Sequence, residues 1–275
     1  MSQVAIIGAG DLGGAVAWAL AGRDRIRRIL IVDAAANAAA GKALDMMQSG
    51  AIDRFHTTLE GTDDLTRIIG SDVCVIADRF GGSGEWQGEE GLALIGRVLP
   101  YAGTSPLVFA GASQSALILS SGKELRVGGT RMIGSAAEAL ASAVRAVVAV
   151  EALSSPRDVN LAVLGAPPSF VVPWGAATIG GHLAESVLDQ VQLHRLQARL
   201  ASMWPPGPTA LGTAAARIVE AAVESSRSWY SVMTLLTGEY GTSNTVGTVP
   251  ALLGPRGVVK TRTPALSPRE RALIL

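Results

Sequence analysis

Three glycines near the start of the chain have a spacing that suits phosphate binding. Gly8, Gly10 and Gly13 form the pattern G-x-G-x-x-G between two apolar runs, 4–7 and 15–20. Such glycines allow a tight turn, a close approach of the backbone to a pyrophosphate and close packing of a helix on a strand. Free amides and a partial positive charge at the N-terminus of the helix bind the anion. The pattern therefore predicts a strand, a turn and a helix that bind a dinucleotide, although a glycine turn can also serve packing alone.

An acidic residue follows at the distance that a dinucleotide site requires. Asp33 ends a second apolar run, 29–32, about twenty residues after Gly13. Such a carboxylate accepts hydrogen bonds from the hydroxyl groups of the adenosine ribose. Alanines rather than an arginine follow it at positions 34–36, which favours NAD over NADP. From the residues alone, we expect the cofactor to be bound by Gly8, Gly10, Asp11, Leu12, Gly13 and Asp33.

Composition argues against several other classes of protein. The 275-residue chain has 23 basic and 23 acidic residues, so no excess of charge would attract nucleic acid or an anionic membrane. Its single cysteine, Cys74, excludes an intrachain disulfide and a cysteine-rich metal site. No apolar run is long enough to span a bilayer, and a first strand that begins by residue 3 predicts no signal peptide. We expect a soluble, cytoplasmic protein without a metal site.

Strands and helices alternate through the first half of the chain. Strands are expected at 4–7, 29–33, 56–60, 72–77 and 106–110. Helices are expected at 15–20, after Asp33 through 41–48, and at 89–101, with a helical turn at 63–69 and a glycine-rich loop at 78–88. This order predicts a Rossmann-type, doubly wound parallel sheet.

The second half differs in character. A helix is expected at 136–153, a strand at 159–164 and, on either side of Pro205 and Pro206, two further helices. Strand-like runs at 231–236, 246–253 and 258–262 precede a last helix that starts with the capping box Ser267-Pro-Arg-Glu270. The prediction is an α/β protein with an NAD-binding domain at 1–133 and an α+β, substrate-type domain at 134–275.

Several segments resemble the lactate/malate dehydrogenase family. Residues 41–48, GKALDMMQ, resemble the family's GKALDLLQ, and residues 155–165, SPRDVNLAVLG, resemble SPKDVHALVLG. Residues 172–181 are similar to VPLWRYATVGG, and residues 238–258 carry the family's GEYG, VP, LG and GV. The resemblance runs from end to end, in a chain shorter than most members.

The resemblance implies a fold, a chemistry and partners. The family transfers a hydride between nicotinamide and a 2-hydroxy acid, so NAD(H) and a small-molecule substrate are the implied partners. Members usually pair through the helix that contains residues 42–47, which implies a homodimer or homotetramer. Apolar Ala43, Leu44, Met46 and Met47 exceed what one buried helix face needs.

This sequence lacks the residues that the family uses for hydride transfer at the positions that align with them. The family uses a His as proton donor and acceptor, an Asp that orients it, and arginines that bind the substrate. Here Pro167 stands at the His position of GGHGD, and Ala141 stands at the Asp position of LDSAR. Gly82 and Gly88 align with the two arginines of the mobile loop, and Gly111 aligns with the Asn of TNPVD. Loss of the family's hydride transfer is therefore expected.

Three charged side chains are the candidates for a replacement site. Arg145 falls one residue after the family's carboxylate-binding Arg, and one extra residue rotates a helical side chain by about 100°. Arg79 is the nearest cation to the loop, where Asp78 replaces a glycine close to the pyrophosphate. His182 follows the segment 178–181 and matches no catalytic position. Ala77 and Gly111 complete the cofactor-binding residues that the resemblance implies.

Three hypotheses stay open. The chain is a family member that keeps the fold and NAD as a sensor, partner or structural subunit, without the chemistry. Alternatively, it is an active NAD-dependent oxidoreductase on a small hydroxy or keto acid of the malate or lactate class, with a rearranged site that recruits Arg145, Arg79, Thr209 or Ser169. The third hypothesis is a true lactate or malate dehydrogenase whose alignment around Pro167 is mistaken.

Overall fold

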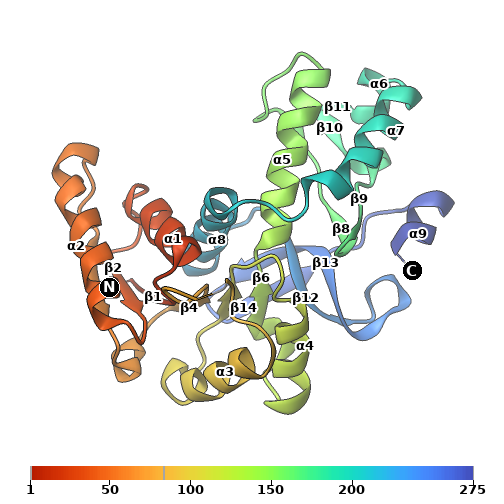
Figure 1. Ribbon diagram of the computed structural model, residues 1–275. Coiled ribbons are helices and arrows are strands. Elements are labelled where there is room, and N and C mark those ends of the chain that lie inside the picture. Colours follow the sequence, from red (N-terminus) through yellow and green to blue (C-terminus); the bar gives the residue numbers. More distant parts are fainter. Residues whose placement is uncertain (1, 83, 275) are drawn as a thin grey trace.

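A single sheet runs through the computed structural model, which describes residues 2–82 and 84–274 (Figure 1). Its strand order is β3-β2-β1-β4-β5-β6-β12-β13-β8-β9, and β14 pairs with β13. The first six positions are parallel, and the others pair antiparallel. A smaller antiparallel sheet has the order β11-β10-β7.

The parallel half consists of short, buried apolar strands covered by helices on both faces. Its elements are β1 (Gln3–Ile7), α1 (Asp11–Ala21), β2 (Arg28–Val32), α2 (Ala36–Asp53), β3 (Thr58–Thr62), β4 (Val73–Ile76), α3 (Gly88–Ala102), β5 (Leu107–Phe109), α4 (Ser115–Glu124) and β6 (Met132–Gly134). Helices α1 and α2 lie on one side of the sheet, and α3 and α4 lie on the other (Figure 1). The strand order reverses between β1 and β4, and ligands of such sheets bind at the carboxyl ends of the strands next to this point.

The second half extends the sheet and builds a lobe beside it. Its elements are α5 (Ala136–Glu151), β7 (Val159–Asn160), β8 (Leu164–Ala166), β9 (Ser169–Val171), β10 (Thr178–Ile179), β11 (His182–Leu183), α6 (Ala184–Val187), α7 (Gln190–Arg199), α8 (Pro208–Val223), β12 (Tyr230–Thr237), β13 (Ser243–Gly254), β14 (Gly257–Thr261) and α9 (Pro268–Ile274). Short 3-10 turns occur at Leu65–Ile68, Gly129–Arg131, Trp174–Ala176, Leu200–Met203 and Glu239–Gly241. The fold is therefore the predicted one, a doubly wound parallel sheet followed by an α+β part.

Buried apolar side chains form two clusters. The first fills the parallel half and includes side chains of α8, β12 and β13, whereas the second lies among α5, α7 and the smaller sheet. Helix α8 packs closely on α1 because Gly212 has no side chain; a Cβ atom at this position would overlap Ala15. Arg23, two residues after the end of α1, forms an ion pair of 2.9 Å with Glu220 of α8. The domain boundary near residue 133 stays a prediction.

Local hydrogen bonds explain where elements differ from the sequence-based expectations. The strand expected at 56–60 begins at Thr58, because the Asp24 carboxylate accepts the amides of His56 (2.7 Å) and Thr57 (3.0 Å). The strand expected at 159–164 is divided into β7 and β8, and α4 was not predicted. The capping box is confirmed: the Ser267 amide donates to Glu270 Oε2 (2.7 Å), and the Glu270 amide donates to Ser267 Oγ (3.3 Å). Across the described residues, no helix combines the length and apolar character needed to cross a membrane.

Candidate functional site

The glycine turn joins β1 to α1 in the geometry that its spacing predicts. Gly8 has φ +120°, a conformation that favours glycine. A Cβ atom on Gly8 would overlap the Asp78 carbonyl oxygen, and one on Gly13 would overlap the Gly8 carbonyl oxygen. Gly10 is the N-cap of α1 and supplies no capping side chain. Two of the three glycines thus serve close backbone packing, and Gly10 leaves space above the helix end.

Asp33 lies at the end of β2 and is almost fully buried. Its Oδ2 accepts hydrogen bonds from the amides of Ala9 (2.8 Å) and Phe80 (2.9 Å), and its Oδ1 accepts one from Ala35 (2.9 Å). A carboxylate offers about four lone-pair positions. Three of them are engaged by backbone amides, so the capacity that we expected to serve ribose hydroxyls is largely used within the chain.

The Asp78 carboxylate lies against the N-terminus of α1. Its Oδ2 accepts the amide of Leu12 (3.0 Å), its Oδ1 accepts that of Gly13 (2.8 Å), and its carbonyl oxygen accepts that of Gly10 (3.2 Å). These are the amides that the sequence assigns to a pyrophosphate. A Cβ atom on Gly10 would overlap the Asp78 carboxylate. The space that Gly10 leaves open is therefore filled by a side chain of the same protein.

A second carboxylate occupies the end of β5. Glu85 Oε1 accepts the amide of Ala112 (2.8 Å), and its Oε2 accepts that of Ser113 (2.7 Å). A Cβ atom on Gly111 would overlap Glu85 Oε2. Glu85 also forms an antiparallel bridge with Asp78. The two carboxylates thus belong to one folded segment that lies along the carboxyl ends of β4 and β5.

Gln114 holds this segment to the sheet and is completely buried. Its Oε1 accepts the amide of Gly111 (2.8 Å), and its Nε2 donates to the carbonyl oxygens of Ala77 and Trp86, both at 3.2 Å. Trp86 returns a hydrogen bond from its amide to the Ala77 carbonyl (3.2 Å). One amide side chain therefore links the ends of β4, β5 and the loop.

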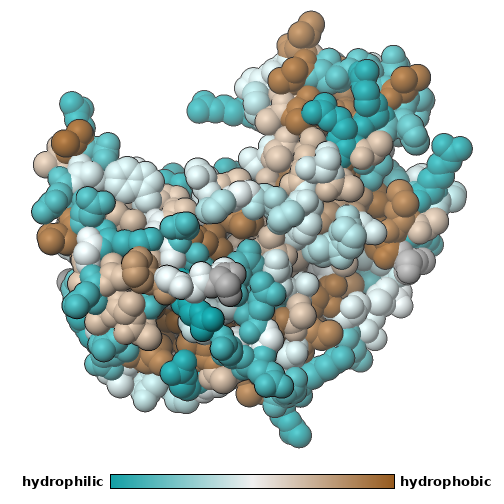
Figure 2. All heavy atoms as spheres, in the orientation of Figure 1, coloured by the Kyte–Doolittle hydropathy of each residue, from teal (hydrophilic) through white to brown (hydrophobic). Residues whose placement is uncertain are grey.

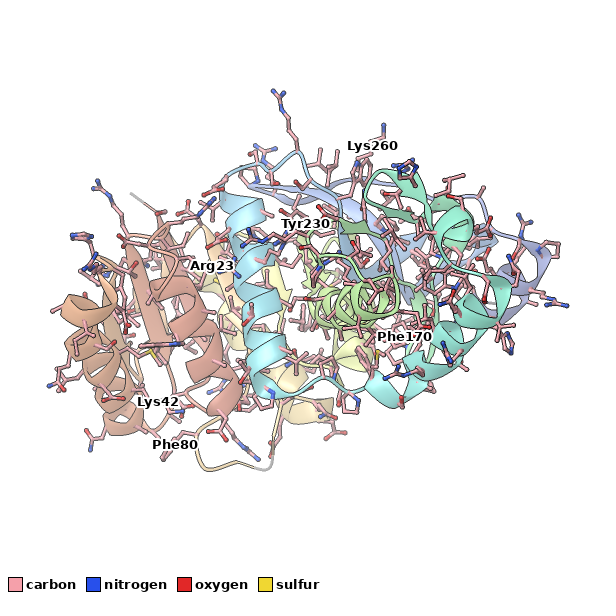
Figure 3. The ribbon with its side chains drawn as sticks, turned by 90° about the horizontal axis from the view of Figure 1, so that it is seen from above. Arg23, Lys42, Phe80, Phe170, Tyr230 and Lys260 are labelled. Carbon is pink, nitrogen blue, oxygen red and sulfur yellow. The ribbon has the colours of Figure 1, made fainter. Side chains whose placement is uncertain are left out.

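The cations near the glycine turn and the loop that follows β4 have partners within the chain. Arg79 pairs with Glu90 at 2.9 Å, and its guanidinium lies 5.5 Å from the centre of the Trp86 ring. Lys42 Nζ donates to the Gly10 carbonyl oxygen at 2.7 Å. Figure 3 labels Lys42 and Phe80 at the same edge of the molecule in that view. Asp11, a predicted cofactor contact, is exposed and lies 4.0 Å from Lys42.

The position of the family's proton-transfer His is a hairpin turn. Pro167 and Pro168 form the turn between β8 and β9, joined by a cis peptide bond. Ala166, Pro168 and Ser169 on either side are exposed. Proline has neither a titratable group nor an amide proton, so nothing at this position exchanges a proton.

Helix α5 directs Arg145 toward a carboxylate of the same helix. Arg145 Nη1 lies 2.8 Å from Glu138 Oε1, and Glu138 Oε2 accepts the amide of Ser231 (2.9 Å). The Glu138 side chain is 3% exposed and that of Arg145 is 21% exposed. Ala141, at the Asp position, is fully buried in the second apolar cluster. The pairing leaves Arg145 neutralised rather than free to bind a substrate carboxylate.

The three histidines lie at exposed positions outside the cleft. His182 is on β11 in the distal part of the second lobe, and His194 is on α7 (Figure 1). His56 precedes β3, at the amino ends of the parallel strands, and its Nδ1 lies 3.0 Å from Asp24. The amino ends are the opposite edge of the sheet from the glycine turn. Thr209 is also exposed, at the start of α8.

The structure brings together most of the expected cofactor residues and adds three that the sequence analysis missed. Gly8, Asp33, Ala77 and Gly111 lie at the carboxyl ends of neighbouring strands, and Gly13 lies in the first turn of α1 beside them. The missed residues are Glu85, Gln114 and Lys42. Glu85 could have been considered from the sequence, because it is an acid in the glycine-rich loop next to the expected phosphate site. These features define the class of the protein: a Rossmann-type dinucleotide-binding fold with an attached α+β lobe.

Sequence relatives cover nearly the whole chain. The malate dehydrogenase of Chlorobium phaeobacteroides is 26% identical over 286 residues, which are 98% of this chain and 92% of that protein. The L-lactate dehydrogenase of Geotalea daltonii is 27% identical over 307 residues, covering 98% of this chain and 94% of that protein. No family model matches the chain.

Solved structures agree with this fold. The malate dehydrogenase from Salinibacter ruber has a TM-score of 0.87 at 24% identity, covering 99% of this chain and 92% of that chain. The lactate dehydrogenase from Cryptosporidium parvum, solved with lactic acid and nicotinamide adenine dinucleotide, has a TM-score of 0.89 at 20% identity and covers 99% and 93%. Over its full length the chain is therefore similar to malate and lactate dehydrogenases, and it shares their fold.

Proposed function

We propose that this chain is a non-catalytic member of the family, with the fold retained and the hydride transfer lost. Pro167 at the position of the proton-transfer His is the observation that carries the proposal. A general acid–base group contributes about 10²–10⁴ in rate. Ala141 and Gly111 remove the orienting Asp and the Asn at the same time, and residues that act as a unit do not lose activity independently.

We also propose that the chain binds NAD(H) weakly, in the cytoplasm and as a homo-oligomer. The strand–turn–helix unit with Gly8, Gly13 and an acid at Asp33 supports binding of the adenosine half, although backbone amides use three of the positions at which Asp33 accepts hydrogen bonds. Against tight binding, the amides of Leu12 and Gly13 are taken by Asp78, and the Phe80 amide is bonded to Asp33. In this arrangement the residues do not fit a dinucleotide, because its pyrophosphate would need the amides that the carboxylate holds.

The alternative of an active oxidoreductase with a rearranged site has little support from the geometry. Arg145 and Arg79, its two candidate cations, are each within 3 Å of a carboxylate partner, at 2.8 and 2.9 Å. Binding a substrate carboxylate would require either arginine to leave its partner. Ser169 and Thr209, the two hydroxyl candidates, are exposed on the surface.

Turnover measurements test the proposal. Purified protein with NADH and pyruvate or oxaloacetate, and with NAD and lactate or malate, should show no conversion above the background without protein. Pro167→His should not restore activity, because the new imidazole would lack its Asp and the substrate would lack its arginines. Reductase activity in the wild-type chain that disappears in Asp33→Ala would contradict the proposal and would make Arg145 and His182 the next residues to substitute.

A further inference from the structure

We infer that Asp78 and Glu85 form a carboxylate clasp that closes the dinucleotide cleft from within, so that a dinucleotide binds only after the clasp leaves. The inference rests on the proposed function only in taking the glycine turn as the dinucleotide site. It concerns binding and not turnover. Asp78 occupies the phosphate position, and Glu85 occupies the end of β5.

The Asp78 carboxylate caps α1 from another part of the chain. An N-cap side chain normally accepts the amide of the second or third helical residue. Here the N-cap is Gly10, and Asp78 accepts both such amides, those of Leu12 and Gly13. A pyrophosphate at a Rossmann turn uses the same donors and the same favourable end of the helix dipole. The carboxylate and the phosphate therefore compete for one position.

Glu85 gives the clasp its second contact. Its two oxygens accept consecutive amides, Ala112 and Ser113, and its carboxylate fills the space beside Gly111 that any larger residue would need. In the family this position is an Asn, which the resemblance places against the nicotinamide ribose. The Glu85 carboxylate therefore fits beside residue 111 only because that residue is a glycine. The two carboxylates cover the phosphate and nicotinamide portions of the cleft.

The segment that carries the clasp is fixed at both ends. Asp78 and Glu85 pair in an antiparallel bridge, and the buried Gln114 bonds the carbonyl oxygens of Ala77 and Trp86 on either side of it. The Phe80 amide adds a hydrogen bond to Asp33 at 2.9 Å. A short segment whose ends already meet loses little entropy on closing. The closed arrangement is therefore stabilised by the hydrogen bonds of Gln114 and Phe80 as well as by the two carboxylates.

Charge opposes a dinucleotide in the same place. Asp33, Asp78 and Glu85 bring three carboxylates to the site. Of the two cations described there, Arg79 is paired with Glu90 and Lys42 donates to the Gly10 carbonyl oxygen. Like charges close together at low dielectric repel strongly. A pyrophosphate would add its own negative charge to this set. Removing one carboxylate should therefore improve binding by releasing amides and by reducing repulsion.

Calorimetric titration with NADH and with ADP-ribose tests the clasp. The double variant Asp78→Gly/Glu85→Gln should bind NADH at least about tenfold more tightly than the wild-type chain, a factor that corresponds to about 1.4 kcal/mol. Asp78→Gly alone should already improve the affinity for ADP-ribose. Glu89→Gln is the matched control, because Glu89 is an exposed acid at the start of α3 and its loss should leave both affinities unchanged.

Amide exchange gives a second measurement that needs no ligand. The amides of Leu12 and Gly13 should exchange slowly in the wild-type chain and at least about tenfold faster in Asp78→Asn, which keeps the side-chain shape and provides a variant if Asp78→Gly does not fold. Equal NADH affinity in the wild-type chain and the double variant would overturn the clasp, as would fast exchange of these amides in the wild-type chain. Turnover by the wild-type chain would contradict the proposed function and leave this binding comparison intact.

Discussion

Two glycines of the site, Gly10 and Gly111, each lie against an acidic side chain. Gly10 and Gly111 each leave a space that a carboxylate fills, Asp78 at the first and Glu85 at the second. In a dinucleotide-binding turn the same glycine spacing leaves room for a phosphate. The glycine pattern therefore predicts a position for an anion. Which anion binds there depends on residues elsewhere in the chain, here Asp78.

Cys74 permits a prediction about pH and reactivity. Burial in the parallel sheet raises the pKa of its thiol to about 12. A thiol is neutral below its pKa, so at pH 8 only about one molecule in ten thousand carries a thiolate, the reactive form. Native protein should therefore react with a thiol-specific disulfide reagent only as fast as it unfolds, and fully in denaturant. Complete labelling of the native protein within minutes would contradict this burial.

At the scale of elements, helix α5 carries a charged pair whose partners both lie on the helix itself. Glu138 and Arg145 form an ion pair along one face of the helix, and Glu138 also accepts the Ser231 amide on β12. Removing one partner of a buried ion pair leaves an uncompensated charge, whereas replacing both by apolar groups is often neutral. Arg145 is therefore expected to contribute to stability and not to substrate binding.

A double-mutant cycle on α5 tests this assignment. Arg145→Met should lower the free energy of unfolding by about 3 kcal/mol, and Glu138→Gln/Arg145→Met should recover part of that loss. Denaturant unfolding measures each variant, with Arg157→Met, at an exposed arginine, as the control. Strictly additive losses would show that the two side chains do not interact.

Helix α2 has an apolar surface that the chain itself does not cover. Ala39 and Ala43 are buried against the sheet, whereas Leu44 is 57% and Met47 is 46% exposed. Figure 2 shows apolar atoms at the edge of the molecule over this helix. Exposed apolar side chains on one helix face are typical of a subunit interface.

We therefore expect a dimer or tetramer at micromolar concentration. Leu44→Asp/Met47→Asp should produce monomers in light scattering, because it places two charges in the expected interface. The control is Val259→Asp, at an exposed position on β14, which should leave the assembly unchanged. A wild-type chain that is monomeric at these concentrations would contradict the pairing.

At the scale of the whole molecule, sequence reasoning predicted the architecture better than the site. Apolar runs such as 4–7 and 29–32 identify buried strands because helices cover both faces of a parallel sheet. The Ser267–Glu270 capping box was predictable because it depends on neighbouring residues alone. Helix α4 was missed because its sequence, SALILSSGKE, has no strong start signal or sustained apolar stripe.

The contents of the cleft could not be predicted from spacing. Gly8, Gly13 and Asp33 are local to one strand–turn–helix unit and were found. The contact between Asp78 and the Leu12 amide joins residues 66 positions apart, and it depends on how the loop folds back on β4. Side-chain direction in such a loop is set by tertiary contacts, here through Gln114.

A single-turnover experiment tests most directly whether the fold has been kept while its chemistry has been lost. The wild-type chain and Asp78→Gly/Glu85→Gln, each in excess over NADH, are mixed with pyruvate or oxaloacetate, and the absorbance of the reduced nicotinamide is followed. Protein in excess ensures that weak cofactor binding does not hide the chemical step. We predict that the absorbance stays constant in both proteins, because Pro167 supplies no proton. Substrate-dependent loss of absorbance in either protein, at a rate above the protein-free reaction, would contradict the account.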